Sequence, residues 1–232
     1  MSTPYQLKIS PIVDVYQGEF PIKWTKMNPL PYRAILQCSK GQFHQDEKCP
    51  TYVQECNELG IKYGLYHFLF PNNIAEQVDN FNRWVEAVGG LGHLPPIVDV
   101  EYAPKQLKPG QVDNMPRGTA WADQVKKCLD NLEASWGEKP MIYTSRNFWS
   151  YLSDQMGGQP EWTNDYPLWV AWYPNKNVID SLDAPRTTRM PIGWDAWDLW
   201  QYSQSGRTDG FFANDLNVIA LEYKALLDAR FP

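Results

Sequence analysis

Short apolar runs recur along the chain, and most of the early ones are separated by longer polar stretches with helical periodicity. The runs are rich in β-branched and aromatic residues, which is typical of buried strands. We expect strands at residues 9–15, 34–38, 63–69, 96–101, 141–144, 168–172, 199–202 and near 215–217. We expect helices at residues 51–59, 74–88, 120–136 and 148–155.

The alternation of strands and helices predicts a parallel sheet with helices outside it. Between residues 168 and 217 the strands are instead separated by loops rich in Pro, Asp and Gly. The eight strands could close a barrel that is β/α at first and nearly all β at the end. A length of 232 residues fits one such α/β barrel, and two small domains would also fit. Because no repeat or linker is visible, a single domain over residues 1–232 is the better interpretation. The loops at 103–118 and 174–195 are long enough to be functional or lid-like.

Two carboxylates follow a short apolar strand in the segment Leu94-Pro-Pro-Ile-Val-Asp-Val-Glu101. Side chains two residues apart in a strand point to the same face, with Cα atoms about 6.6 Å apart. Asp99 and Glu101 should therefore project together, although two such acids repel each other and resist burial. Glycosidases hydrolyse sugar linkages with paired carboxylates of this kind.

Catalytic groups of α/β barrels lie at the C-terminal ends of the strands. This rule selects Asp14, Tyr66, His67, Asp99, Glu101, Tyr143, Trp172, Gln201 and Asp215. Four acids are then expected to converge on one rim. Tyr66, Tyr143, Trp172 and Gln201 are candidates for substrate contact, whereas His67 is interpreted as a hydrogen-bonded structural residue.

Composition excludes several other classes of protein. A net charge of −6 without a basic cluster argues against nucleic-acid binding. No run of some 18 apolar residues predicts a membrane span, and the N-terminus lacks the apolar core of a signal peptide. We therefore expect synthesis in the cytoplasm. The eleven Trp and thirteen Tyr fit either a large aromatic core or a cleft lined with rings that pack on sugars.

Four cysteines show no C-x-x-C spacing, so we expect no metal site and no cofactor. In a reducing compartment they would be free thiols. Cys49 and Cys56 could pair if the protein works outside the cell.

Six segments carry a resemblance to a known family, and together they span about residues 9–219. They are Val13-Asp-Val-Tyr-Gln-Gly18 with Trp24; Gly64-Leu-Tyr-His-Phe68 with Pro71; Pro96-Ile-Val-Asp-Val-Glu101; Pro140-Met-Ile-Tyr-Thr144 with Trp149; Tyr166-Pro-Leu-Trp-Val-Ala171; and Trp200-Gln-Tyr-Ser203 with Gly206, Gly210 and Asp215-Leu-Asn217. Each is weak alone, but in this order they resemble glycoside hydrolase family 25, the Chalaropsis-type lysozymes of fungi, bacteria and bacteriophages.

The resemblance implies an N-acetylmuramidase that cuts the β-1,4 bond from N-acetylmuramic acid to N-acetylglucosamine in peptidoglycan. It also implies an irregular TIM-like barrel of five β/α units followed by three strands. Glu101 would be the proton donor and Asp99 its partner, with Asp14 and Asp215 completing an acidic floor. A free Glu has a pKa of about 4.3, so its neighbours must raise the pKa of Glu101. Asp99, if hydrogen-bonded or solvated, could stay ionised and either stabilise the reacting centre or orient the 2-acetamido group of a self-assisting substrate.

Three positions depart from the family pattern. Tyr16 stands where the family usually has Ser, Gln37 replaces a basic residue, and Lys40 replaces an acid. None removes one of the four acids, but each could alter subsites or the pH optimum.

The setting that these features favour is a bacteriophage endolysin that acts on the cell wall as a monomer, reaches it through a holin, and carries no separate wall-binding domain. Two other functions stay open. One is a chitinase or endo-N-acetylglucosaminidase with related acid chemistry. The other is a glycan-binding module without catalysis, although the presence of all four acids argues against it.

Overall fold

A computed structural model describes residues 11–19, 22–101, 119–154, 160–175, 186–187, 189–208 and 211–231. The expected loop at 103–118 lies outside these residues, as does most of the loop at 174–195.

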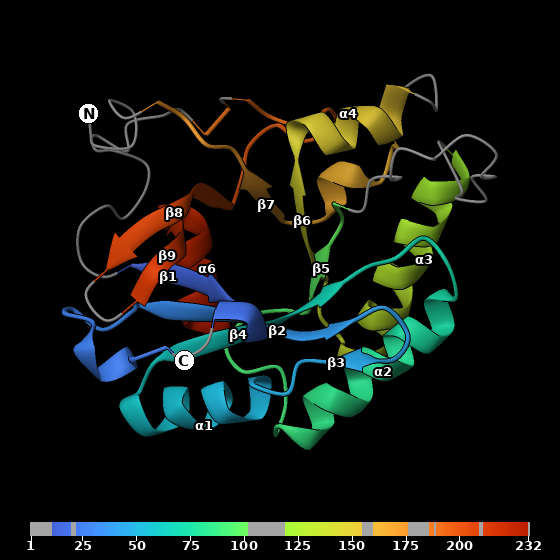
Figure 1. Cartoon of the computed structure of the whole chain (residues 1–232). Coiled ribbons are helices and arrows are strands. Elements are labelled where there is room, and N and C mark those ends of the chain that lie inside the picture. Colours follow the sequence, from blue (N-terminus) through green and yellow to red (C-terminus); the bar gives the residue numbers. More distant parts are fainter. Residues whose placement is uncertain are drawn as a thin grey trace, which may run out of the picture.

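Eight of the strands in the described part of the chain close into a barrel (Figure 1). They are β1 (Ile12–Val15), β2 (Arg33–Lys40), β4 (Lys62–Phe68), β5 (Ile97–Asp99), β6 (Met141–Ser145), β7 (Leu168–Ala171), β8 (Leu199–Thr208) and β9 (Phe211–Ile219). Their spatial order is β1-β9-β8-β7-β6-β5-β4-β2, and β1 pairs with β2 to complete the ring. The short strand β3 (His44–Gln45) extends the end of β2. The expected TIM-like α/β barrel is confirmed.

The barrel is irregular in both its strands and its helices. All neighbours are parallel except β9, which runs antiparallel to β8 and to β1. Helices α1 (Cys49–Leu59), α2 (Ile74–Ala87), α3 (Thr119–Trp136) and α4 (Arg146–Asp154) follow β2, β4, β5 and β6. After β1 the described chain forms only the 3-10 turns Gln17–Glu19 and Trp24–Lys26, and a third such turn, Thr163–Asp165, precedes β7.

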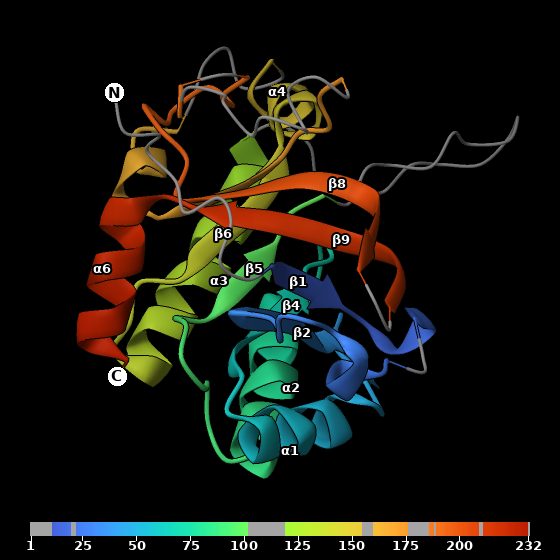
Figure 2. The same cartoon turned by 90° about the vertical axis from the view of Figure 1, so that its left-hand side faces the viewer.

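Helix α6 (Leu221–Arg230) was not expected from the sequence. Figure 2 shows it where β8 begins and β9 ends, which is the N-terminal end of the parallel strands. Leu227 of α6 joins the apolar residues inside the barrel at this end. Arg33 at the start of β2 is buried and contacts Asp228 of α6 through Nη2 and Oδ1 at 2.9 Å. The helix therefore closes the barrel floor. No helix in the described ranges is long and apolar enough to cross a bilayer.

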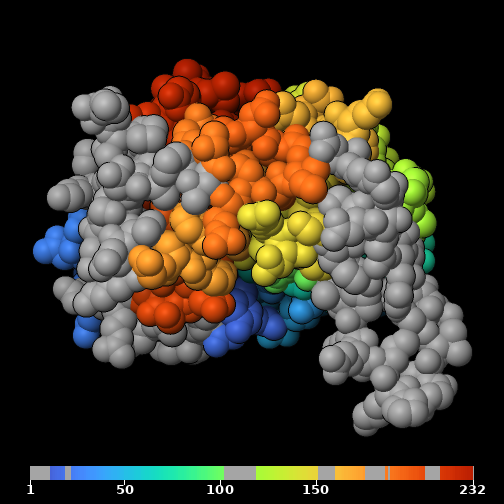
Figure 3. Space-filling view, turned by 90° about the horizontal axis from the view of Figure 1, so that it is seen from above, coloured from blue at the N-terminus to red at the C-terminus, as the bar shows by residue number. Residues whose placement is uncertain are grey.

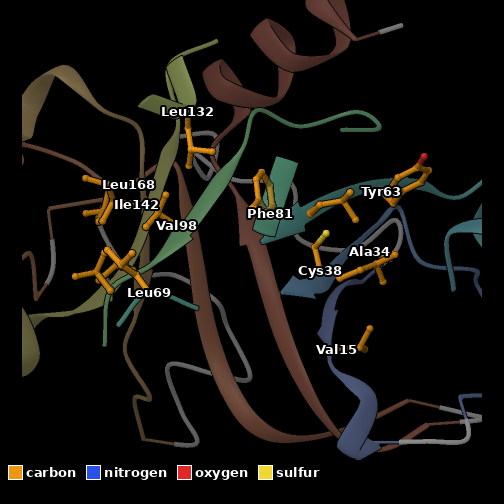
Figure 4. Packing of buried hydrophobic residues seen from close by; sticks show 14 of the residues in the cluster. Val15, Ala34, Cys38, Tyr63, Leu69, Phe81, Val98, Leu132, Ile142 and Leu168 are labelled. Atoms are coloured by element: carbon orange, nitrogen blue, oxygen red, sulfur yellow. The ribbon is translucent and has the colours of Figure 1, made fainter. Parts of the chain in front are cut away.

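Apolar side chains cover both faces of the strands. The outer face packs under the helices, where Val98, Ile142 and Leu168 from β5, β6 and β7 lie together (Figure 4). Helix α3 contributes its predicted apolar stripe to this layer, including Val125, Leu129 and Leu132.

The inward face changes character along each strand. Ile12, Ile35, Ile97 and Leu199 form an apolar layer near the strand starts. Two residues further on, the same faces carry Asp14, Gln37, Asp99 and Gln201. Because side chains alternate with a period of two, β1, β2, β5 and β8 each supply one apolar and one polar side chain to the interior. This gradient places a polar site at the C-terminal edge of the barrel.

All four cysteines are buried free thiols. Cys49 is the first residue of helix α1, and Cys56 lies near the end of the same helix. Seven residues of α-helix separate two Cα atoms by about 10 Å, beyond the reach of a disulfide. A Cys49–Cys56 bond is therefore incompatible with this fold.

Candidate active site

A pocket of about 300 Å³ opens at the C-terminal edge of the barrel. The four acids selected from the sequence, Asp14, Asp99, Glu101 and Asp215, all line it. Its other lining residues are Tyr16, Gln37, Lys40, Tyr66, Phe68, Tyr143, Trp169 and Gln201. Three of these, Tyr16, Gln37 and Lys40, are the positions that depart from the family pattern.

Strand register brings the acids together from distant parts of the chain. Asp14 of β1 is paired with Asp215 of β9. Asp99 of β5 is paired with Tyr143 of β6. Glu101 lies two residues beyond the end of β5, so it continues the face that carries Asp99. The predicted convergence of four acids on one rim is what the structure shows.

Gln201 is the centre of a buried hydrogen-bond network. Its Oε1 accepts hydrogen bonds from Tyr143 Oη at 2.8 Å and Tyr173 Oη at 2.5 Å. Its Nε2 donates to both carboxylate oxygens of Asp14 at 3.0 Å and to Asp215 Oδ2 at 3.5 Å. Asn217 Nδ2 also donates to Asp14 Oδ2 at 2.6 Å. Two donors on Oε1 fix the orientation of the amide, so its NH₂ group points at the acids.

Asp99 has a different environment. Its side chain is buried, and Oδ1 has no hydrogen-bond partner among the described residues. Burial raises the pKa of Asp99 well above its usual range, and the charges of Glu101 and Asp14 raise it further, whereas Lys40 opposes them. The side chain is therefore not solvated, and within the described part of the chain Oδ1 lacks the hydrogen bond that would favour the ionised form. Oδ1 can therefore accept a hydrogen bond from a ligand that enters the pocket.

Glu101 lies at the exposed rim of the pocket. Partial desolvation by the pocket walls raises its pKa, the Asp215 carboxylate raises it further, and Lys40 lowers it. Lys40 Nζ lies 4.3 Å from the centre of the Phe68 ring, which holds the ammonium beside the acids. A carboxyl group that is open to solvent and keeps its proton to higher pH suits a general acid.

Aromatic rings form one wall of the pocket. Tyr66 and Tyr143, two of the expected contacts, both pack on Trp169, with ring centroids 6.5 and 4.4 Å apart. Trp172, the third expected aromatic, does not line this pocket. Its ring stacks on Trp200 at 5.1 Å, on the other face of the sheet.

Two residues of the network were missed by sequence reasoning. Tyr173 and Asn217 both contact the central groups, Tyr173 through Gln201 and Asn217 through Asp14. Strand alternation could have found Tyr173, because Trp169, Ala171 and Tyr173 share one face of β7 and its extension, and Trp172 falls on the opposite one. Asn217 shares a face of β9 with Asp215 in the same way.

His67 has the structural role expected for it. Its ring is buried, with Nδ1 2.8 Å from Ser39 Oγ and Nε2 3.2 Å from Gln77 Oε1. Burial lowers the pKa of His67 to about 4, so the ring is neutral at physiological pH. It does not reach the pocket.

The geometry supports acid-assisted cleavage of a bond held across the rim. One carboxyl group can give up a proton at the opening, and a second, buried one offers an unused acceptor. Two further acids are held in place by amide donors. Such a set can protonate a leaving oxygen and stabilise positive charge that develops beneath it.

Comparison with known proteins places the chain among glycan-cleaving enzymes. The family model described as "Glycosyl hydrolases family 25" matches residues 13–211. Lysozyme M1 of Streptomyces globisporus is 24% identical over 209 residues, which cover 85% of this chain and 63% of that protein.

Solved structures share the fold. The spore cortex lytic enzyme SleM of Clostridium perfringens has a TM-score of 0.74 at 25% identity, covering 92% of this chain and 69% of SleM. The catalytic domain of endolysin ply40, from bacteriophage P40 of Listeria monocytogenes, has a TM-score of 0.67 at 18% identity, covering 96% of this chain and 98% of that domain.

Proposed function

Because the chain belongs to glycosyl hydrolase family 25, we propose that it is an N-acetylmuramidase that hydrolyses the β-1,4 bond between N-acetylmuramic acid and N-acetylglucosamine in peptidoglycan. The observation that carries this proposal is the pocket in which Asp14, Asp99, Glu101 and Asp215 converge. Its aromatic wall of Tyr66, Tyr143 and Trp169 offers flat faces for sugar rings.

Glu101 is the general acid in this proposal. Its raised pKa lets the carboxyl group keep its proton to higher pH than a free glutamate would, and its place at the rim gives it access to the glycosidic oxygen. The proton passes from Glu101 to that oxygen as the bond to the anomeric carbon breaks. Glu101 then accepts a proton from the water that attacks in the second step.

Asp99 assists through the substrate. Its Oδ1, which has no hydrogen-bond partner among the described residues, can accept a hydrogen bond from the N–H of the 2-acetamido group. The acetamido oxygen then attacks the anomeric carbon as the glycosidic bond breaks, which forms a cyclic intermediate. Water later attacks the anomeric carbon and opens this intermediate, so that the configuration is retained. Asp14 and Asp215 hold negative charge beneath the developing cation, with Gln201 as their common donor. We assign substrate contact to Tyr66, Tyr143 and Gln201 in this pocket and to Trp172 beyond it.

Product analysis tests the proposal. Purified peptidoglycan is digested with the protein and with its Glu101→Gln variant, and the new reducing ends are identified by mass spectrometry. We expect muramic acid at these ends and a loss of at least about 100-fold in rate for the variant. Glu86→Gln, an exposed acid of α2, is the matched control and should retain full activity.

Other outcomes would identify other functions. Glucosamine at the new reducing ends would indicate a chitinase or endo-N-acetylglucosaminidase. Tight binding of glycan without any release of reducing ends between pH 4 and 8 would indicate a binding module. Either result would overturn the muramidase.

The proposed setting is bacteriophage lysis, with the chain as a monomeric catalytic domain that a holin admits to the wall. The fold likeness to the endolysin ply40 catalytic domain is compatible with this setting. Expression in a bacterial host should cause lysis only when a holin is co-expressed. Lysis without a holin, or a dimer in light scattering, would contradict it.

A further inference from the structure

A second pocket, of about 450 Å³, adjoins the acid pocket. Glu101 and Tyr143 line both pockets, so the two are neighbours on either side of the proposed proton donor. The second pocket is otherwise lined by Ser145, Arg146, Asn147, Ala171, Trp172, Tyr173, Arg189 and Gln204. These residues come from the β6–α4 junction, the end of β7, and the later third of the chain. Figure 3 shows that the surface near residue 150 adjoins the surface of this later third on one face of the molecule.

The second pocket differs from the first in charge. Asp14, Asp99, Glu101 and Asp215 face the first pocket with Lys40 as the only cation among its lining residues. Arg146 and Arg189 face the second, where Glu101 at the shared boundary is the only acid among the lining residues.

Both arginines are exposed, and neither has an ion-pair partner among the residues that the structure describes. By contrast, Arg33, Arg186 and Arg230 are each paired with a carboxylate. Arg189 also has a positive φ of 58°, a conformation that costs free energy for a residue other than Gly and is common at functional sites. The guanidinium groups are thus available to a ligand.

We propose that this second pocket binds a carboxylate of the glycan strand through Arg146 and Arg189. The inference rests on the proposed function. Asp14 and Asp215 can stabilise positive charge in the first pocket, so the sugar that becomes cationic lies there. The second pocket, beyond Glu101, then receives the leaving part of the strand. Guanidinium groups bind carboxylates with paired hydrogen bonds, and an unmodified chitin chain has no carboxylate to offer.

Peptidoglycan has two sources of this group. One is the free lactyl carboxylate of muramic acid where the stem peptide is missing. The other is the set of carboxylates on the stem peptide itself. Trp172 also lines this pocket, and one face of its ring stacks on Trp200. The ring supplies an apolar surface beside the arginines for the attached sugar or peptide.

Binding measurements in the inactive Glu101→Gln protein test this inference without depending on turnover. The probes are muramyl tetrasaccharides with free lactyl groups, the same glycan with stem peptides, and a form in which all carboxylates are methylamidated. Calorimetry gives Kd for each probe with Arg146→Gln, with Arg189→Gln, and with both changes. The matched control is Arg83→Gln, an exposed arginine of α2 without an ion-pair partner among the described residues.

We expect Kd for a carboxylate-bearing probe to rise about 3-fold for each single variant and about 10-fold for the double variant. Binding of the methylamidated probe and of all probes to Arg83→Gln should not change. An effect limited to the lactyl probe or to the peptide probe identifies the source. Lysine at both positions should recover part of the affinity, since it keeps the charge but not the planar fork.

Equal losses for the charged and the methylamidated probes, or no loss for any probe, would overturn the inference. The active protein separates this result from the proposed function. Normal muramidase activity with arginine-independent binding would refute the carboxylate site alone. Arginine-dependent binding without any hydrolysis by the wild-type protein would refute the muramidase and leave the carboxylate site in place.

Discussion

Asp14 and Asp215 are direct partners in the register between β1 and β9, and Gln201 donates a hydrogen bond to each of them. Like charges at such close quarters repel, so the pair favours a state with a single negative charge. Asp14 accepts bonds from Gln201 and Asn217, which stabilise its ionised form. Asp215 is the half-buried member, and burial raises its pKa to about 6, although the hydrogen bond with Asp14 works in the other direction.

Replacing Asp215 by Asn should stabilise the protein at neutral pH. An acid with a raised pKa costs no stability below about pH 4, where it is protonated in both states, and the cost grows as pH rises to about 6. The difference between the folded and unfolded pKa of Asp215 corresponds to at most about 3 kcal/mol of unfolding free energy. Because the group is half-exposed, we expect about 1 kcal/mol. Urea unfolding at pH 4 and pH 7 measures this. A gain at pH 7 no larger than the gain at pH 4 would contradict it.

Replacing Lys40 by Met should move the activity profile to higher pH. The ammonium lowers the pKa of both Glu101 and Asp99, so its removal lets Glu101 keep its proton longer. The alkaline limb of kcat/KM should shift upward by about half a pH unit, as expected for a charge in a partly solvated pocket. Lys127→Met on the exposed face of α3 is the control. An unchanged or downward-shifted limb would show that Lys40 does not act on the acid.

Removing both phenols that bond to Gln201 should cost more than the two single losses combined. With Tyr143→Phe or Tyr173→Phe alone, one donor still holds Oε1 and keeps the NH₂ group on Asp14. Each single variant should lose about 3-fold in kcat. Without either donor the amide can rotate and present Oε1 to the carboxylate. A double-mutant cycle on kcat measures the coupling, and strictly additive effects would argue that the amide is held by other groups.

Asp228→Asn should destabilise the fold without changing the site. Asp228 is itself partly desolvated, but bonds from Lys224, Tyr32 and Arg33 lower its pKa to about 2. A lowered pKa gives stability that is present above about pH 4 and lost as pH falls toward 2. The variant should lose about 2 kcal/mol at pH 7, because the buried Arg33 charge is left with less compensation. Thermal unfolding from pH 2 to 7 checks this, and equal losses at both ends would refute the ion pair as the cause.

Much of the barrel could be predicted because strand and helix periods differ. All eight strands and the helices after β2, β4, β5 and β6 lie at their expected places, although β8 and β9 are longer than the expected 199–202 and 215–217. The apolar stripe of α3 is a clear case, because Trp121, Val125, Leu129 and Leu132 recur at helical spacing and are all buried. Helix α6 was not predicted, because few of its residues are buried. Its main anchor, Asp228, bonds to residues almost 200 positions earlier in the chain. Contacts over such a separation leave no local pattern.

The acids could be placed from the sequence, but their individual environments could not. Position at strand ends predicted that Asp14, Asp99, Glu101 and Asp215 would meet. Which of them is hydrogen-bonded depends on Gln201, Asn217 and two tyrosines from separate strands. Asp99 was expected to stay ionised if it was hydrogen-bonded or solvated, and it is Asp14 that receives the amide donors. Trp172 was predicted to contact substrate, and it lines the neighbouring pocket and not the acid pocket. Tyr173, one residue later, bonds to Gln201. The period of two along β7 separates these two positions.

The order of residues along the chain has a consequence for synthesis. Asp14 lies near the beginning and Asp215 near the end, and their pairing also closes the barrel. A nascent chain that has already released β1 to β7 from the ribosome still lacks Gln201, Asp215 and the seam between β9 and β1. The acid pocket therefore forms only after β8 and β9 have been synthesised, and any shorter product carries Asp99 and Glu101 without Gln201 and Asp215.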